Sequence, residues 1–434
     1  MLLTEKSWIG EFFVPDDYHN RFLGKIDYSP EEGVVLSWHV ASDKLPRKSN
    51  VIHGVLDTGE KCALIYPLYE SDLSMKSKQG LHTRHGKTRF SFLLIGDFIA
   101  ENELFYEVCF SITNLQEFFF PKGWKDQVKY SDGPLLSISS SLGEIEVGNS
   151  APFGFLSNDI TSHIYAKNKD ALKELDDEFK LISTKYQDPV FVFKKDISYL
   201  FRIKVKEGDV VNAIHDYVKN ISGLFALLVY HPVFPEYIYV TKRNGNPPVQ
   251  IDLFPTVIRN KKTLELSVRE LSHFNMPITN DKVELAPILI NWLDKPELYS
   301  TIVASLQNET GFRDEHSLHG ELVLYAAQLE MITHKESPKC NEKYKYPIDK
   351  YASTDLKNRL QSVLAQVGSN NIGEVIADIR NEIAHVGRPK KLLSVLSMLD
   401  LIEISSCLHM TVMGYILSEL GINKDIIAEY QRVF

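Results

Sequence analysis

The spacing of apolar residues changes near Pro277, and this change restricts the possible folds more than any other feature of the chain. From Gly33 to about Val205, apolar and polar residues alternate in short runs between turn residues, which is typical of half-buried β-strands. From Val283 onward, apolar residues recur at intervals of three and four, which is typical of amphipathic helices. We therefore expect an α+β multidomain protein, with a β-rich N-terminal domain followed by an all-α helix bundle.

The predicted elements divide the chain into three parts. Predicted strands cover residues 34–40, 51–56, 62–68, 89–95, 104–112, 135–139, 179–184, 190–193 and 199–205. A helix capped by Asp209 and a hairpin of 237–241 with 249–253 follow. Predicted helices cover residues 283–306, 317–333, 349–366, 372–386, 392–420 and 424–433. We expect a β-rich N-terminal domain at 1–207, a connecting region at 208–280 and an all-helical domain at 281–434.

Composition restricts the class of protein further. With 44% apolar and 24% charged residues, the 434-residue chain has enough apolar material for sizeable cores. A net charge of −9 disfavours binding nucleic acid through bulk electrostatics, so any RNA contact should be a local site. The four cysteines are scattered, which favours reduced thiols, and neither a signal segment nor a membrane span is apparent. These features predict a cytoplasmic protein.

Arg380 and His385 are the residues that most suggest chemistry. Arginine keeps its charge near neutral pH while histidine exchanges a proton there, so the pair suits a reaction in which phosphate charge develops, such as RNA cleavage by its own 2′-hydroxyl. The spacing alone is weak evidence, because 13 arginines and 14 histidines in 434 residues give roughly 0.4 such pairs by chance. Context adds to it: an apolar stripe (Val375, Ile379, Ile383 and Val386) forms one helix face, and Asn381 and His385 share another.

Simpler interpretations remain open for each of these signals. Arg380 and His385 also suit the negative end of a helix dipole without any catalytic role. The histidine pairs 316/319 and 82/85 have metal-ligand spacing but no obvious third ligand, so structural histidines are favoured and no metal is expected. Residues 343–351 are the candidate RNA-contacting loop, in which aromatic rings would stack on bases and lysines would neutralise phosphates; the residues concerned are Lys343, Tyr344, Lys345, Tyr346 and Tyr351. A plain connection between helices fits this segment too. Glu330 is either a supporting residue behind the arginine or a solvated charge.

The motif Arg380-Asn381-Glu382-Ile383-Ala384-His385 at the end of a helix in an all-helical domain resembles the HEPN superfamily. The ribonucleases of that superfamily carry an R-x(4 to 6)-H motif with a polar residue after the arginine. The β-rich N-terminal half, with Phe12-Phe13-Val14-Pro15 near its start, resembles the sensor half of ApeA-type anti-phage proteins.

The resemblance implies a metal-independent, cofactor-free endoribonuclease of abortive infection that cleaves structured cellular RNA, particularly tRNA. It implies Arg380, His385 and Asn381 as catalytic residues, a homodimer through the helical domain, and a phage-derived trigger. The expected products carry 2′,3′-cyclic phosphate and 5′-hydroxyl ends. Two alternatives stay open: a non-catalytic HEPN-like module that binds RNA or protein, and a HEPN toxin controlled by a separately encoded antitoxin.

Overall fold

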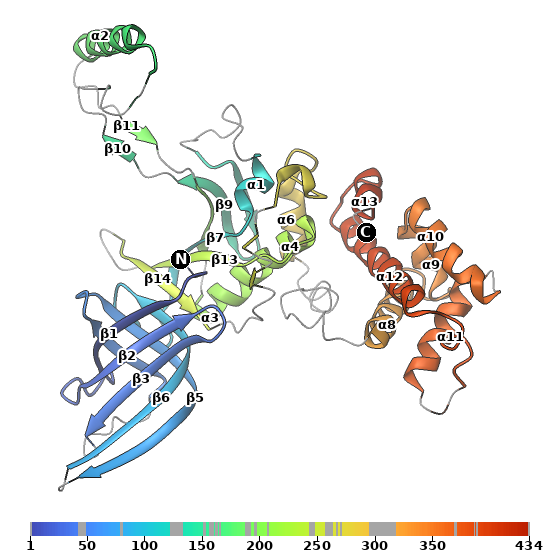
Figure 1. Ribbon diagram of the computed structural model, residues 1–434, viewed down its shortest axis with the longest axis horizontal. Coiled ribbons are helices and arrows are strands. Elements are labelled where there is room, and N and C mark those ends of the chain that lie inside the picture. Colours follow the sequence, from blue (N-terminus) through green and yellow to red (C-terminus); the bar gives the residue numbers. More distant parts are fainter. Residues whose placement is uncertain are drawn as a thin grey trace.

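The computed structural model divides into a β-rich N-terminal half and a helical C-terminal half (Figure 1). It describes residues 2–41, 49–78, 81–121, 133–150, 153–155, 160, 164, 166–186, 192–194, 198–205, 208–242, 248–256, 264–265, 268–269, 271–294, 318–368, 371–385, 387, 389–432. The α+β prediction is confirmed, with strands up to residue 255 and helices from 285 to 430.

The strands of the N-terminal half form one large sheet. Their bounds are β1 (Lys6–Phe13), β2 (Phe22–Ser29), β3 (Gly33–Ala41), β4 (Val51–Leu56), β5 (Lys61–Lys78), β6 (Leu81–Ile95), β7 (Phe105–Ile112), β8 (Leu136–Ser140), β9 (Gly143–Ser150), β12 (Ser198–Val205), β13 (Pro235–Lys242) and β14 (Gln250–Pro255). The order is β3-β2-β1-β4-β5-β6-β14-β13-β7-β12-β9-β8, and all the pairings are antiparallel. An additional pairing of β3 with β6 closes β1 to β6 into a barrel.

The β13–β14 hairpin was expected in the connecting region, yet both of its strands belong to the sheet. β13 pairs with β7 and β14 pairs with β6, so the hairpin links the barrel to the remaining strands. A small separate hairpin joins β10 (Phe153–Phe155) and β11 (Val192–Lys194). Three strands of the sheet, β1, β2 and β9, extend the predicted set, while β8 matches the strand predicted at 135–139.

One predicted strand, residues 179–184, is wrong. These residues lie in helix α2 (Lys169–Lys185), which begins where the Asn168 side chain accepts hydrogen bonds from Asp170 and Ala171. The helix stands apart from the sheet in Figure 1, and Phe179 is its only buried residue among those described. With so little of α2 buried, its pattern of apolar residues carried little information on secondary structure.

Short helices cover the strands of the sheet that lie outside the barrel. They are α1 (Leu115–Phe119), α3 (Val210–Asn212), the π-helix η3 (Ala213–Lys219), α4 (Asn220–Val229), the 3-10 turn η4 (His273–Asn275) and α6 (Leu285–Asp294). Asp209 caps α3 through a capping box with Asn212, which confirms that predicted start. Phe225 of α4 packs edge-on against Phe118 of α1 and Phe201 of β12, so α1 and α4 are joined to the sheet by aromatic contacts.

The C-terminal half is a bundle around the long helix α12. Its helices are α8 (Leu318–Glu336), α9 (Lys345–Tyr351), α10 (Thr354–Leu364) with the 3-10 turn η7 (Ala365–Val367), α11 (Ile372–Ala384), α12 (Met398–Glu419) and α13 (Lys424–Tyr430). α12 contacts α8, α9, α10 and α13, and α11 packs on α8. Among the described residues α12 is the one helix long and apolar enough to cross a membrane. However, 78% of its most apolar stretch is buried, as in the core helix of a globular domain.

The helix predicted at residues 283–306 has its described part in α6, which packs on the N-terminal half. Trp292 donates a 2.9 Å hydrogen bond from its indole nitrogen to the Asn220 carbonyl, and the Ser141 hydroxyl donates a 3.2 Å bond to Asp294. Within the described residues α6 contacts α4 and β8, and the domain start expected at residue 281 stays a prediction.

Candidate active site

Helix α11 presents the Arg380–His385 motif at its C-terminal end. Asn371 caps the start of α11, and the buried residues of the helix face α8 and the bundle core; they are Ile372, Val375, Ile376, Ile379 and Glu382. The helix ends at Ala384, two residues earlier than predicted. His385 is its C-cap in extended backbone conformation, with its N–H still bonded to the Asn381 carbonyl at 3.1 Å. The His385 side chain is therefore exposed where the chain leaves the helix.

Arg380 is half-buried and bonded to its neighbour Asn381. Its Nη1 donates a hydrogen bond of 3.2 Å to Oδ1 of Asn381, while its Nε is buried and has no acceptor among the described residues. Buried donors normally have a partner, so an unsatisfied guanidinium donor is an exception that calls for an explanation. A guanidinium with spare donors is suited to bind a phosphate oxygen.

Glu330 of α8 lies close enough to Arg380 to interact with it electrostatically. The hydrogen bond from Lys343 (Nζ to Oε1, 2.6 Å) lowers the pKa of Glu330, and the charge of Arg380 lowers it further. The Tyr344 hydroxyl donates a longer bond of 3.4 Å to the same carboxylate. Glu330 therefore lies near the motif helix. Its carboxylate is bonded directly to Lys343 and Tyr344.

The segment predicted as an RNA-contacting loop is largely helix α9, and two of its aromatic rings are buried. Tyr344 and Tyr351 are each 8% exposed, so neither ring can stack on a base in this conformation. Tyr351 hydrogen bonds to Glu336, which also pairs with Lys350 at 2.9 Å. Lys345 pairs with Glu342 at 3.2 Å. Lys343, Lys345 and Tyr346 are the residues of this set that remain at least partly exposed.

Glu382, inside the motif, has a structural role that its sequence position did not reveal. Its buried carboxylate accepts hydrogen bonds of 3.0–3.1 Å from the backbone N–H groups of Lys391, Leu392 and Leu393. These bonds hold the chain after His385 against the end of α11. In the sequence, Glu382 falls on the apolar face of the predicted helix. A charged residue on an apolar face indicates buried hydrogen-bond partners, so the sequence alone could have predicted this role.

An exposed apolar surface begins shortly after the motif. Val395, Met398, Leu399 and Ile402 are all exposed, and Leu399 is 77% exposed. Met398, Leu399 and Ile402 are one, three or four residues apart in the first turns of α12, and Val395 lies just before the helix; we call these four residues the α12 patch. Charged residues would be expected on a solvated helix face, so this patch is suited to contact another protein.

No group of three or more His, Cys, Asp or Glu side chains that could hold a metal ion is found within the described residues. Of the two histidine pairs considered, His316 lies outside the described residues, as does the side chain of His82. His85 hydrogen bonds through Nε2 with Ser74 at 2.8 Å.

A β-rich N-terminal half is joined to a helical domain that carries an arginine, a polar residue and a histidine at one helix end, and the resemblance to HEPN proteins rests on this arrangement. The family model "ApeA N-terminal domain 1" matches residues 7–292, well over half of the chain, and the model "Apea-like HEPN" matches residues 308–426. The chain therefore belongs to the ApeA-type HEPN proteins of anti-phage defence. Comparisons with curated proteins and with solved structures found no match.

Proposed function

We propose that this protein is a metal-independent endoribonuclease that cleaves structured cellular RNA, with tRNA as its main target, during anti-phage abortive infection. The observation that carries the proposal is the end of α11, where the exposed His385 follows an arginine that has an unsatisfied donor and a bond to Asn381. A proton acceptor and a phosphate-binding cation at one helix end are the groups that cleavage by a 2′-hydroxyl requires.

In the proposed mechanism His385 removes the proton from a ribose 2′-hydroxyl, whose oxygen then attacks the adjacent phosphorus. Arg380 stabilises the charge of the phosphorane through charge-assisted hydrogen bonds, and Asn381 orients Arg380. The 5′-oxygen leaves with a proton supplied from the opposite side. The products are a 2′,3′-cyclic phosphate and a 5′-hydroxyl end.

In-line cleavage needs an acid and a base on opposite sides of the phosphorus, and one motif supplies a single histidine. We propose that a homodimer supplies the second, with His385 of the partner subunit as the acid. The α12 patch supports this arrangement, because its first residue, Val395, is two residues after Leu393, the last residue whose backbone Glu382 holds against the motif helix. Burying such a patch would stabilise a dimer close to the motif.

We also propose a division of labour between the two halves. Residues 1–294 would form the sensor and residues 318–432 the nuclease, with the boundary in the segment between them. The nuclease would be restrained until a phage-derived trigger binds, because an unrestrained ribonuclease acting on host tRNA would be toxic. Its target RNA would place the protein in the cytoplasm.

The test is cleavage of total bacterial tRNA by purified full-length protein in excess EDTA, with the product ends mapped. His385→Ala should lower the rate by about 10² to 10⁴, and Arg380→Ala by a comparable factor. His319→Ala is the matched control, since this exposed histidine lies eleven residues before Glu330 on α8, roughly 16 Å away along the helix. Cleavage by His385→Ala at the parent rate would refute the assignment.

Two alternative functions give different outcomes in related experiments. A binding module would retain tRNA on a filter without cutting it, even in lysate from phage-infected cells. A toxin controlled by a separate antitoxin would gain mass on co-expression with a neighbouring nucleotidyltransferase.

A further inference from the structure

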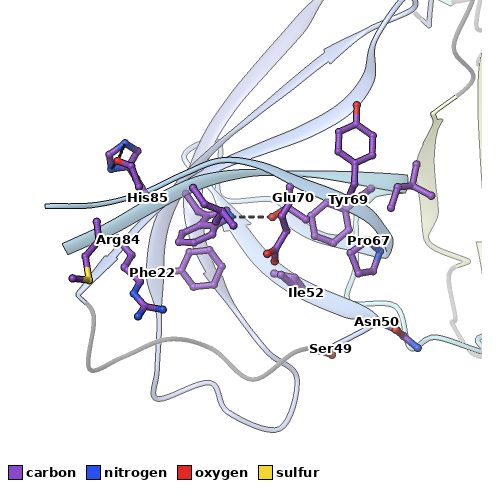
Figure 2. A pocket seen from close by; sticks show the side chains of 16 residues that line it. Phe22, Ser49, Asn50, Ile52, Pro67, Tyr69, Glu70, Arg84 and His85 are labelled. Atoms are coloured by element: carbon purple, nitrogen blue, oxygen red, sulfur yellow. Dashed lines mark hydrogen bonds between the residues drawn. The ribbon is translucent and has the colours of Figure 1, made fainter. Parts of the chain in front are cut away.

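The closed barrel of the N-terminal half contains a pocket at one end (Figure 2). Its volume is about 990 Å³, at the upper end of the range of roughly 300–1,000 Å³ typical of ligand pockets. The lining residues come from the start of β2, the end of β3, the start of β4 and the facing parts of β5 and β6. All of these segments meet at the same end of the antiparallel barrel, so the pocket is the barrel mouth.

Two irregularities interrupt β5 beside this mouth. The pairing of β5 with β6 shifts register between Pro67 and Tyr69 and again between Ser71 and Ser74. Tyr66 and Asp72, beside these shifts, have φ values of 57° and 54°, in the left-handed region that non-glycine residues rarely occupy. Figure 2 shows Pro67 and Glu70 on the same side of the strand as Phe22, while Tyr69 lies on the other side. Backbone strain of this kind is often retained at ligand sites.

The floor of the mouth is aromatic and the rim is apolar. Phe22, Trp38 and Phe90 line the floor, and the Trp38 indole N–H is bonded to the Thr88 hydroxyl at 2.9 Å, which leaves the faces of the ring for apolar contact. At the rim Leu73 is 59% exposed and Met75 is 58% exposed. An apolar side chain entering the mouth would therefore find apolar contacts at the rim and at the floor.

Two opposite charges lie in the same hollow. Figure 2 shows Arg84 and Glu70 extending toward the space beside Phe22. No hydrogen bond or ion pair involves either side chain within the part of the chain that the structure describes, whereas the nearby His85 is bonded to Ser74. One cation and one anion leave the mouth with no excess positive charge, which disfavours a nucleotide or nucleic acid. They suit a ligand that offers an anion or carbonyl oxygen together with an N–H donor.

We propose that the barrel mouth binds a short segment of a partner protein, which inserts an aromatic or aliphatic side chain onto the floor formed by Phe22, Trp38 and Phe90. A carboxylate or carbonyl of the segment pairs with Arg84, and a backbone N–H donates to Glu70. A peptide combines these three features, while an apolar small molecule lacks the polar groups and a nucleotide carries the wrong charge. The identification of this segment as the trigger rests on the proposed function; its binding does not.

The experiment starts with a library of random linear peptides selected on the full-length His385→Ala protein, so that binding is measured without nuclease activity. Enriched peptides are labelled and titrated by fluorescence anisotropy. We expect an apolar or aromatic residue next to an acidic one. Arg84→Glu and Leu73→Asp should each weaken binding about tenfold or more, which corresponds to about 1.4 kcal/mol. Because Arg84 and Leu73 are exposed, neither change should unfold the barrel.

The matched controls are Lys76→Glu and Ile9→Asp. Lys76 is an exposed cation of β5 outside the lining, and Ile9 is a 56% exposed apolar residue of β1 outside it. Both variants should bind within about twofold of the parent, since neither contacts the mouth. Equal affinity across all four variants, or no enrichment over an Arg84→Glu/Leu73→Asp bait, would overturn the proposal. So would ATP binding that Arg84→Glu abolishes, because it would assign the mouth to a nucleotide.

Failure of this inference and failure of the proposed function give different results. A peptide bound at the mouth of a protein that cleaves no tRNA, with or without that peptide, would leave the peptide site standing and count against the ribonuclease. Cleavage of tRNA by a protein that enriches no peptide would support the ribonuclease and count against the peptide site.

Discussion

The hydroxyl of Tyr430, in the last helix of the bundle, donates a buried hydrogen bond of 2.6 Å to the main-chain carbonyl of Leu227 in α4. Tyr230, the left-handed C-cap of α4, lies against the same tyrosine and against His409 of α12, with ring centroids 5.8 and 6.0 Å apart. These contacts join the helical half to the half that carries the barrel. They are the contacts through which restraint would pass if the N-terminal half controls the nuclease.

Tyr430→Phe should loosen this connection. Loss of one buried hydrogen bond costs about 1 kcal/mol, because the Leu227 carbonyl keeps its backbone bond from Tyr230. We expect a small fall in melting temperature and a rise in basal toxicity, measured as slower growth of induced cells. Tyr415→Phe is the control, since its bond with Lys335 (2.7 Å) lies within the bundle and its loss should not raise toxicity. Equal growth of the two strains would count against restraint through this contact.

Glu382→Gln should slow RNA cleavage although Glu382 is not proposed to touch RNA. The amide can accept hydrogen bonds through one oxygen only, so some of the N–H groups of residues 391–393 lose their acceptor, at a cost of about 1–3 kcal/mol. The segment after His385 should then move, which lowers kcat more than it raises KM. Glu374→Gln, an exposed residue in the first turn of the same helix, should leave both constants unchanged. A kcat equal to that of the parent would mean that the backbone bonds do not position His385.

Leu399→Asp should disrupt the proposed homodimer. A charge within a buried apolar patch leaves an unpaired carboxylate in the interface, so the mass measured by light scattering should fall to that of the monomer. Cleavage should fall with it, because each active site would lack its second histidine. Leu181→Asp is the control, since this residue is 61% exposed on α2, outside the helical domain. If the Leu399→Asp protein remains dimeric, the dimer interface does not include the α12 patch.

The ion pair of Glu330 with Lys343 predicts a pH-dependent contribution to stability. Because the hydrogen bond from Lys343 lowers the pKa of Glu330 below its ordinary value of 4.5, the pair stabilises the fold above pH 4.5 and loses this effect as the pH falls through the folded-state pKa. Glu330→Gln should therefore unfold at lower denaturant concentration than the parent at pH 7, with a difference that shrinks below pH 4.5. The difference should be small, since the carboxylate is a third exposed.

The control for this prediction is Glu429→Gln, an exposed residue of α13 with no ion pair among the described contacts. Its denaturation midpoint should follow that of the parent at every pH. A gap between parent and Glu330→Gln that stays constant from pH 7 to pH 4 would show that the ion pair does not contribute.

Local preferences explain the parts of the fold that were predicted correctly. The period of apolar residues separated the strands from the helices, and side chains such as Asp209 and Asn371 mark helix starts because they bond to the first free N–H groups of their own helix. The same reasoning fails where local signals conflict. The predicted helix at 349–366 is broken by Ser353, which caps α10, so the segment forms the end of α9 and then α10.

Long-range packing decided what these local signals could not. Closure of the barrel depends on the pairing of β3 with β6, whose partners are about fifty residues apart in the sequence, and it creates the pocket at the barrel mouth. In the same way Tyr344 and Tyr351 looked available for stacking, but the bundle buries both rings, and Glu382 found its partners in a later turn. The sequence by itself determined the two halves and the position of the Arg380–His385 motif, because both depend on neighbouring residues. Only the tertiary structure decided which side chains stay exposed to act, because burial depends on elements distant in the chain.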